Sequence, residues 1–94
     1  MLIHRPVAEN TWCVYMVRCS DGTLYTGITK NLEKRIEAHN SGRDGARYTR
    51  SRRPVRLVYA KQAGSKTAAA RLEYRIKKLK RSQKNELINR KGEV

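Results

Sequence analysis

Two pairs of side chains in the first half of the sequence could act together on a phosphodiester. Arg35 and His39 lie one turn apart on a predicted helix, at inward positions where apolar residues are expected. Tyr15 and Tyr25 lie in two predicted strands. Phosphodiester hydrolysis requires positive charge on the pentacoordinate phosphate, a proton acceptor for water and stabilisation of the leaving group. Arg35 could supply the charge, and either tyrosine or His39 could accept the proton.

Each of these residues also has a structural explanation. An arginine can extend its head group from an apolar surface into water, and a buried histidine is commonly structural. A tyrosine with a pKa near its reference value of about 10 is a poor base, although nearby cations and a metal ion would lower that pKa. Arg35 and His39 attract interest because they lie together beside the sheet face that we expect to carry Tyr15 and Tyr25.

Glu73 is the only acidic residue in the range 45–85. Its spacing from Ala69 and Ile76 places it at the edge of the apolar stripe of a predicted helix. It could form an ion pair with Lys77, which would contribute about 0.3–0.5 kcal/mol. It could instead hold a hard divalent cation, Mg²⁺ or Mn²⁺, against a bound phosphodiester, because Mg²⁺ needs only one or two protein carboxylates. The spacing alone leaves both alternatives open.

A basic segment lies between the first predicted helix and the third predicted strand. Arginine suits bidentate contacts with phosphate, and a tyrosine ring can stack on an unpaired base. A segment kept charged for solubility would carry both signs, whereas acids are nearly missing here, so phosphate binding is the better explanation. The residues expected to contact nucleic acid are Arg47, Tyr48, Arg50, Arg52 and Arg53, with Lys77 in the following helix.

The overall charge indicates the same kind of partner. The chain has 94 residues, with 22 Lys plus Arg against 8 Asp plus Glu, for a formal net charge of +14. An imbalance of this size is typical of proteins that bind a polyanion. The length accommodates one small domain with a thin core and no large enclosed cavity. We find no membrane span or apolar signal segment, and therefore expect a cytoplasmic protein without a membrane partner.

A predicted hairpin must place the two tyrosines relative to each other. The ranges 12–19 and 23–29 are rich in β-branched and aromatic residues and are separated by a turn signal. A two-residue turn would put the tyrosine rings on opposite faces of the sheet. A three-residue loop with Gly22 in the left-handed region pairs Cys19 with Thr23 and puts both rings on one face. We favour the three-residue loop.

The remaining elements follow from periodicity and turn signals. A helix capped near Thr29 or Asn31 ends around 40–42, residues 41–53 form a loop, and a strand covers 55–61. A helix capped by Ser65 covers 66 to about 81, and a last helix covers 82 to about 90. This order, β-β-α-β-α-α, predicts an α+β fold with a small sheet covered by helices. Residues 1–10 are expected to be a flexible lead-in, 11–90 the single domain and 91–94 a tail.

The ordered set of candidate residues resembles the GIY-YIG nuclease domain. The set is Val14-Tyr15, Tyr25-Thr26-Gly27, Arg35, His39 and Glu73, and the likeness covers residues 12 to about 88. Cys13-Val14 and Thr26 depart from the motif that names the family, at positions that pack in strands. The chain is most similar to small stand-alone bacterial members. Its runs Lys-Arg-Ile-Glu-Ala-His-Asn-Ser-Gly and Ala-Arg-Tyr-Thr are also similar to the branch that resolves Holliday junctions.

The resemblance implies a three-stranded, mostly antiparallel sheet flanked by helices and a single-metal hydrolysis. Glu73 would bind the divalent metal, Arg35 would stabilise the phosphoryl transition state, and a tyrosine or His39 would help to activate water. Some members carry an asparagine about three helical turns after the glutamate, where this chain has Asn85. A surface role explains Asn85 equally well. Gly27 and Asn85 are added to the expected nucleic-acid contacts.

The function expected from these features is metal-dependent hydrolysis of DNA by an endonuclease that recognises DNA structure, in repair or recombination. RNA stays open as a substrate, and a partner protein could supply specificity. The sequence does not indicate an oligomeric state. Two alternatives remain, which are a DNA- or RNA-binding module without catalysis and a basic protein associated with ribosomes. An acid beside bound phosphate has no use in binding alone, which argues against the first alternative.

Overall fold

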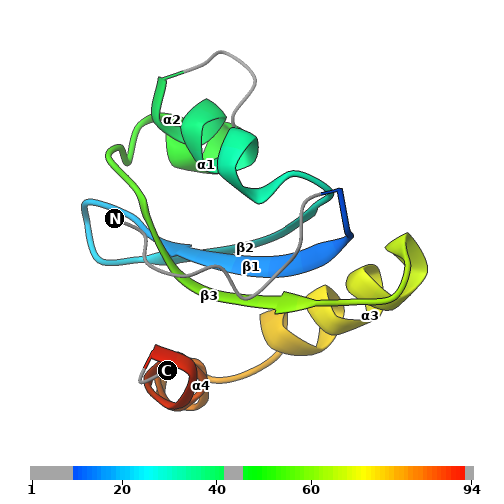
Figure 1. The fold of residues 1–94 in the computed structure, drawn as a ribbon. Helices are drawn as coiled ribbons and strands as arrows, with labels where there is room; N and C mark the ends of the chain where they lie inside the picture. Colours follow the sequence, from blue (N-terminus) through cyan, green and yellow to red (C-terminus); the bar gives the residue numbers. More distant parts are fainter. Residues whose placement is uncertain (1–9, 42–45, 93–94) are drawn as a thin grey trace.

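A three-stranded antiparallel sheet forms the centre of the molecule (Figure 1). The computed structural model describes residues 10–41 and 46–92. The elements in this part of the chain are β1 (Cys13–Arg18), β2 (Leu24–Thr29), α1 (Leu32–Ser41), α2 (Arg47–Arg50), β3 (Arg56–Gln62), α3 (Lys66–Lys77) and α4 (Arg81–Gly92). The strand order is β2-β1-β3, so β1 is central and β2 and β3 form the edges. The predicted α+β class and antiparallel sheet are confirmed.

The hairpin has the predicted three-residue loop. The Cys19 amide donates to the Thr23 carbonyl at 2.8 Å, and Gly22 has a φ of 87°, a left-handed conformation that favours glycine. The strands therefore pair Tyr15 with Gly27 and Val17 with Tyr25. Because side chains alternate along a strand, Tyr15 and Tyr25 project from the same face of the sheet.

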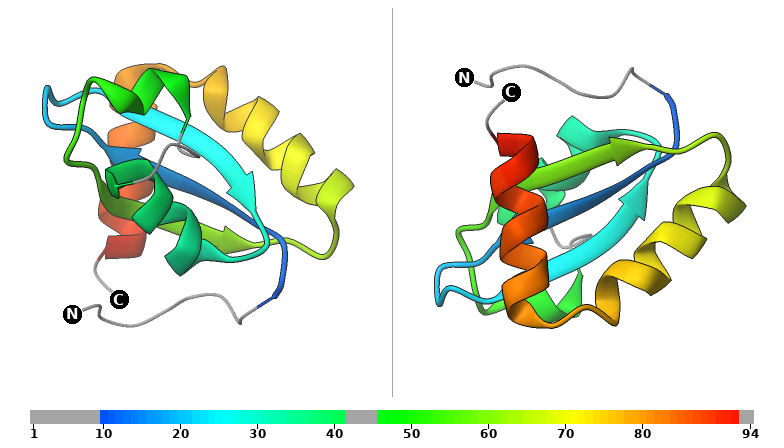
Figure 2. Two further views of the ribbon diagram at one scale, coloured as in Figure 1. Left: turned by 90° about the horizontal axis from the view of Figure 1, so that it is seen from above. Right: turned by 90° about the horizontal axis from the view of Figure 1, so that it is seen from below.

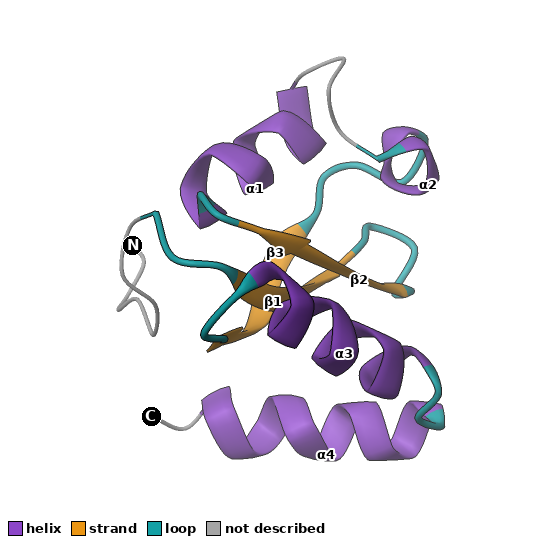
Figure 3. Cartoon of the chain, turned by 90° about the vertical axis from the view of Figure 1, so that its right-hand side faces the viewer, coloured by secondary structure: helices purple, strands orange, loops and turns teal. Residues whose placement is uncertain are grey.

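The two faces of the sheet carry separate cores. Figure 3 shows the sheet between two pairs of helices, with α1 and α2 on one side and α3 and α4 on the other. On the face covered by α1 and α2, Tyr15 and Val17 pack with Leu32 and Ile36 of α1. On the opposite face, a second cluster unites Val14, Met16, Tyr59, Ile76 and Ile88. Successive residues of β1 thus serve opposite cores, as the period of two in a strand requires.

The helix over residues 32–41 is fixed at both ends. Asn31 caps its first turn, with its side-chain oxygen accepting from the Lys34 amide at 3.2 Å. Near its last turn, the Asn40 side chain donates to the Val55 carbonyl at 2.9 Å and accepts from the Val55 amide at 2.7 Å. These bonds join α1 to the start of the third strand, so the helix cannot slide along the sheet without breaking them.

The predicted boundaries need three corrections. Residues 47–50 form the one-turn helix α2 inside the range predicted as a loop. The helix expected to reach about residue 81 ends at Lys77, and the last helix begins at Arg81. The break is stabilised because the Gln83 side chain accepts from the Lys80 amide at 2.9 Å, as in a capping box. The strand predicted at 55–61 runs instead from Arg56 to Gln62.

α3 lies beside the edge strand β2, and α4 lies across the sheet face opposite α1 and α2 (Figure 2). Ser65 caps α3 as predicted, accepting from the Ala68 amide at 3.1 Å. Leu72 and Ile76 of α3 pack into the core of this face. In the part of the chain that the structure describes, every helix is too short or too polar to cross a bilayer. The expected lead-in falls mostly on residues 1–9, outside the described residues.

Candidate active site

The pairing of Tyr15 with Gly27 places a phenol inside the sheet face. Tyr15 is fully buried, and its hydroxyl end lies over Gly27 of the neighbouring strand. A Cβ atom added at Gly27 would lie 2.7 Å from the Tyr15 oxygen and 2.9 Å from its Cζ atom, closer than carbon atoms tolerate. The glycine of the Tyr-x-Gly motif therefore leaves the space that the first tyrosine occupies. Gly27 itself is buried.

The helix α1 brings Arg35 and His39 onto this phenol. Both lie on the same helical stripe as Leu32 and Ile36, which pack into the core of this sheet face. The His39 Nε2 atom lies 2.7 Å from the Tyr15 oxygen, and the Arg35 Nε–H donates to the same oxygen at 3.4 Å. The spacing of the two polar residues predicted this convergence on the tyrosine face.

Tyr25 completes a cluster of rings on the same face. Its ring centroid lies 6.5 Å from that of Tyr15 and 5.4 Å from that of His39, in an edge-to-face arrangement with His39. Tyr25 and Arg35 are partly exposed, whereas Tyr15 and His39 are completely buried. The four predicted catalytic residues therefore form one group, with an outer pair accessible to solvent and an inner pair that is not.

Thr49, which the sequence did not single out, supports the far side of His39. The Thr49 Oγ1 atom lies 2.8 Å from His39 Nδ1, and the hydroxyl donates to the Ala46 carbonyl at 3.0 Å. Thr49 is completely buried although it lies on a helix of four residues. Its only sequence signal is its place in the Ala-Arg-Tyr-Thr run, because four residues are too few for periodicity to predict a helix.

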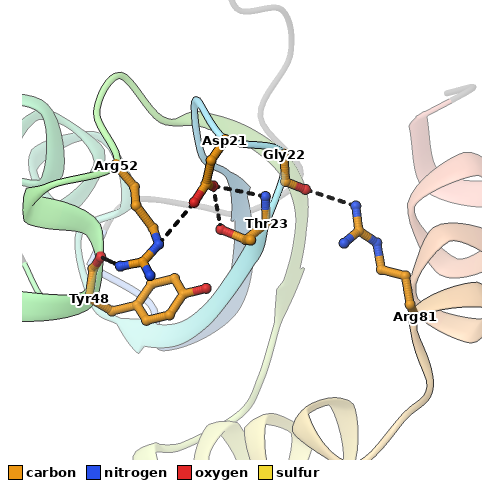
Figure 4. A network of polar contacts seen from close by, with 6 residues as sticks. All are labelled: Asp21, Gly22, Thr23, Tyr48, Arg52 and Arg81. Atoms are coloured by element: carbon orange, nitrogen blue, oxygen red, sulfur yellow. Dashed lines mark hydrogen bonds and ion pairs between the residues drawn. The ribbon is translucent and has the colours of Figure 1, made fainter.

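A second polar network joins α2 to the hairpin loop (Figure 4). The Arg52 Nε–H donates to Asp21 at 3.1 Å, and its Nη1–H donates to the Tyr48 carbonyl at 2.8 Å. The Arg52 guanidinium lies 4.0 Å from the centroid of the Tyr48 ring, and that ring stacks on Tyr25 at 5.9 Å. On the other side of the loop, the Arg81 guanidinium donates to the Gly22 carbonyl at 2.8 Å. The network holds Tyr48 against the outer edge of the cluster.

Burial changes the proton affinity of the inner tyrosine against expectation. Desolvation raises the pKa of Tyr15 to about 12, although the adjacent Arg35 acts in the opposite direction. The nearby cation thus lowers the pKa of Tyr15 as expected, but burial has the larger effect and the pKa lies above its reference value. Tyr15 is a neutral phenol at physiological pH. It can donate one hydrogen bond and accept another.

The charge states of His39 and Arg35 follow from the same surroundings. Burial, and then the positive charges of Arg35 and Arg53, lower the pKa of His39 to about 4. Burial also opposes the charged form of Arg35, but its contacts with Tyr15 and then Tyr25 outweigh burial and raise the pKa of Arg35. The site thus holds a neutral imidazole, a neutral phenol and a permanent guanidinium cation.

Glu73 lies on α3, beside the edge strand β2. Its side chain is 24% exposed, and its carboxylate pairs with Lys77 at 3.2 Å, the ion pair that the spacing offered as one alternative. The bonds that unite Tyr15, Arg35 and His39 do not include Glu73. The described residues contain no group of three His, Cys, Asp or Glu side chains that could hold a metal ion. A single carboxylate suits only a hydrated cation that takes its further ligands from a substrate phosphate.

Some of the residues predicted to contact nucleic acid are exposed, and others are bonded to groups within the protein. Arg47, Arg50 and Lys77 are exposed, and Tyr48 is 39% exposed. Arg52 pairs with Asp21, and the Arg53 Nε–H donates to the carbonyl of His39. Asn85 is partly buried on α4. The side chains of Arg52 and Arg53 thus also hold the site in place, a role that composition could not reveal.

Comparison with known proteins agrees with the fold and the motif. A model of the GIY-YIG catalytic domain matches residues 11–86. The chain is 52% identical to a UPF0213 protein of Desulfotalea psychrophila over 87 residues, covering 92% of this chain and 79% of that protein. It is 56% identical to a UPF0213 protein of Clostridium perfringens over 79 residues, covering 84% of each chain.

A solved structure shows the same likeness. The solution NMR structure of a UPF0213 protein from Bacillus halodurans aligns with a TM-score of 0.57 and 45% identity, covering 87% of this chain and 86% of that one. The chain belongs to the GIY-YIG family. Within that family its relatives are the small UPF0213 proteins. A GIY-YIG domain indicates a nuclease-type activity on nucleic acid, and nucleases of this family generally use a divalent metal.

Proposed function

We propose that this protein is an endonuclease that hydrolyses DNA phosphodiester bonds with a divalent metal ion. We further propose that it recognises DNA structure, such as a branch, flap or nick, and acts in repair or recombination. The observation that carries the proposal is the convergence of Tyr15, Arg35 and His39 through hydrogen bonds, with Tyr25 beside them. Apolar packing alone would not require a guanidinium, an imidazole and two phenols on one face.

The outer pair of the site is proposed to meet the substrate. Arg35 presents a permanent positive charge at the surface of the cluster, where it would stabilise charge that develops on the phosphoryl oxygens. Of the two phenols, Tyr25 is the one that is partly exposed. We assign Tyr25 the contact with the attacking water, because Tyr15 is fully buried and its pKa of about 12 disfavours loss of its proton.

The inner pair is proposed to hold the outer pair in position. Tyr15 accepts from Arg35 and is bonded to His39, so it links the guanidinium to the body of the protein. A neutral His39 adds no positive charge behind Arg35, so Arg35 is the cation that the four-residue cluster offers to a phosphate. The site's chemistry thus depends on buried residues that do not touch the substrate.

Glu73 is proposed to hold the metal ion, Mg²⁺ or Mn²⁺, together with a substrate phosphate. The supporting feature is its chemistry, since it is a half-buried carboxylate in a strongly basic helix. When bound, the metal would supply Lewis-acid stabilisation of the phosphate. With one protein carboxylate, the affinity for metal is expected to be low until a phosphate contributes further ligands.

The surface around α2 is proposed to bind the DNA next to the site. Arg47 and Arg50 are exposed there, and the partly exposed Tyr48 ring lies beside Tyr25. A ring in this position could stack on an unpaired base, which fits a substrate with a branch or a single-stranded segment. The exposed Lys77 and the partly buried Asn85 extend the proposed contacts to α3 and α4.

The proposal is tested with a panel of end-labelled substrates that contains branched, nicked, single-stranded and duplex DNA and the matching RNA. Each is incubated with Mn²⁺ or with EDTA. We expect cleavage of a branched or nicked DNA with Mn²⁺ and none with EDTA. Glu73→Gln should abolish cleavage, whereas the matched control Glu86→Gln, an exposed acid on α4, should retain it.

Other outcomes would identify the alternatives. Tight binding of DNA or RNA without cleavage under any metal condition would make the protein a binding module. Equal cleavage in EDTA would remove the metal from the proposal, and cleavage of RNA in preference to DNA would change the substrate.

A further inference from the structure

The direction of the hydrogen bonds in the buried cluster can be worked out from donors and acceptors. The chain of contacts runs from Arg35 through Tyr15 and His39 to Thr49 and the Ala46 carbonyl. Tyr15, His39 and Thr49 are each completely buried, so bulk solvent does not reach their polar atoms. Each of their donors and acceptors therefore needs a partner within the protein.

The hydrogen bonds at both ends of this series of contacts have a fixed direction. At one end Arg35 can only donate, because a guanidinium has no acceptor, and its Nε–H points at the Tyr15 oxygen at 3.4 Å. At the other end the Ala46 carbonyl can only accept, and it accepts a hydrogen bond from the Thr49 hydroxyl at 3.0 Å. With that proton used, the Thr49 oxygen accepts at its 2.8 Å contact with His39 Nδ1.

The directions at the two ends then determine the directions of the hydrogen bonds between them. If His39 carries its proton on Nδ1 and donates to Thr49, its Nε2 is free to accept the Tyr15 hydroxyl at 2.7 Å. Tyr15 then donates once and accepts once, from Arg35. All four bonds run in one direction, and bonds aligned in this way polarise one another.

The opposite imidazole tautomer leaves a more costly mismatch. With the proton on Nε2, both His39 and Arg35 would donate to the Tyr15 oxygen, and the hydroxyl proton of this buried phenol would need another acceptor. The feature that favours this tautomer is the Ala46 amide, whose N–H points at His39 Nδ1 at 3.4 Å and would donate to it. That contact is as long as the one from Arg35, but Ala46 is only partly buried whereas Tyr15 is completely buried. An amide without this acceptor therefore costs less free energy than a buried hydroxyl without one.

We propose that Thr49 is a positioning residue that holds His39 in the Nδ1–H tautomer and, through Tyr15, orients the Arg35 guanidinium toward the substrate phosphate. Thr49 touches none of the reacting atoms. Its effect on cleavage rests on the proposed nuclease function, whereas its effect on the tautomer does not. The two parts of the proposal can therefore fail separately.

The tautomer is measured by long-range ¹H–¹⁵N NMR of the imidazole nitrogens in labelled protein. The chain contains two histidines, and the spectrum of His39→Gln assigns the signals. We expect a protonated Nδ1 and an unprotonated Nε2 at neutral pH. A protonated Nε2 in the wild-type protein would overturn the proposal.

Two variants of nearly matched size test the part played by Thr49. Thr49→Ser keeps the hydroxyl, so it should keep the wild-type tautomer and a cleavage rate within about 3-fold of wild type. Thr49→Val keeps the shape but removes the hydroxyl, so it should populate the Nε2–H tautomer and lower kcat about 10-fold with little change in KM. Spectra and rates are recorded below the unfolding transition of each variant.

The outcomes separate the proposal from the proposed function. A wild-type tautomer in Thr49→Val, or equal loss of activity in Thr49→Ser and Thr49→Val, would overturn the role of Thr49. If the wild-type protein cleaves no nucleic acid, the proposed function fails. If the predicted tautomers are observed, they would still establish the direction of the hydrogen bonds from Arg35 to the Ala46 carbonyl.

Discussion

The two faces of the sheet are built on different principles although they share the strand β1. On the α3 and α4 face, Val14 and Met16 pack against Tyr59, Ile76 and Ile88, an almost wholly apolar core. On the α1 and α2 face, residues of the same strand pack beside a buried network of side-chain hydrogen bonds. A buried polar network gains little net stability over apolar packing, and it restricts the geometry more strongly. The first face holds the fold together, and the second holds candidate catalytic groups in place.

The largest expected effect on stability comes from the apolar face. Met16 is completely buried, so Met16→Ala should lower the free energy of unfolding by about 2–5 kcal/mol. Tyr74→Ala, at a side chain that is 62% exposed, should change it by less than about 0.5 kcal/mol. Urea denaturation measures both. Equal effects of the two substitutions would show that the apolar face does not carry the fold.

Gly27 tests how closely the polar face is packed. A methyl group there would meet the Tyr15 hydroxyl end, so Gly27→Ala should cost about 1–3 kcal/mol of unfolding free energy. Gly64→Ala is the matched control, because nothing lies within 4 Å of its added Cβ atom. Tyr15→Phe removes the closest atom, so the loss caused by Gly27→Ala should be smaller in that background. An equal loss in both backgrounds would contradict the close approach.

His39 tests the same face by its pH dependence. Its pKa is lowered from 6.5 to about 4 in the folded protein, so the unfolded chain binds its proton first as the pH falls. The stabilisation from neutral His39 is therefore complete above about pH 6.5 and is lost between pH 6.5 and about 4. His39→Gln should flatten the dependence of Tm on pH in this window, measured by calorimetry. An unchanged pH profile would show that His39 is not buried in its neutral form.

The smallest expected effect is at the ion pair of α3. Lys77 and Glu73 are four residues apart, and their side chains are 54% and 24% exposed. Lys77→Met should therefore change the free energy of unfolding by no more than about 0.5 kcal/mol, close to the effect of Lys84→Met on α4. Urea denaturation of the two variants makes the comparison. A loss above about 1 kcal/mol would mean that Glu73 has a structural role, which would weaken its assignment to metal.

Sequence patterns predicted the features of the polar face that depend on regular spacing. The three-residue turn determined that Tyr15 and Tyr25 share a face, and the helical stripe brought Arg35 and His39 to them. The pairing of Tyr15 with Gly27 followed from the same register. Period and register are local properties, which explains why the sequence is informative about them.

The features that were missed depend on contacts between distant segments. Thr49 becomes buried because a one-turn helix folds over His39, and no periodicity marks so short a helix. The raised pKa of Tyr15 results from burial, which the count of nearby cations does not measure. The end of α3 at Lys77 was hidden because Leu79 continues the apolar spacing past the break.

The central claim is that the polar face presents Arg35 to a phosphodiester, and one matched pair of variants tests it most directly. Arg35→Ala and Arg90→Ala each remove one arginine, the first from the cluster and the second from the exposed surface of α4. The measurement is kcat/KM for a branched DNA substrate with Mn²⁺, with Tm recorded alongside. The account predicts a loss of at least about 100-fold for Arg35→Ala, less than about 3-fold for Arg90→Ala, and similar Tm values for both. Equal losses in kcat/KM for the two variants would contradict it.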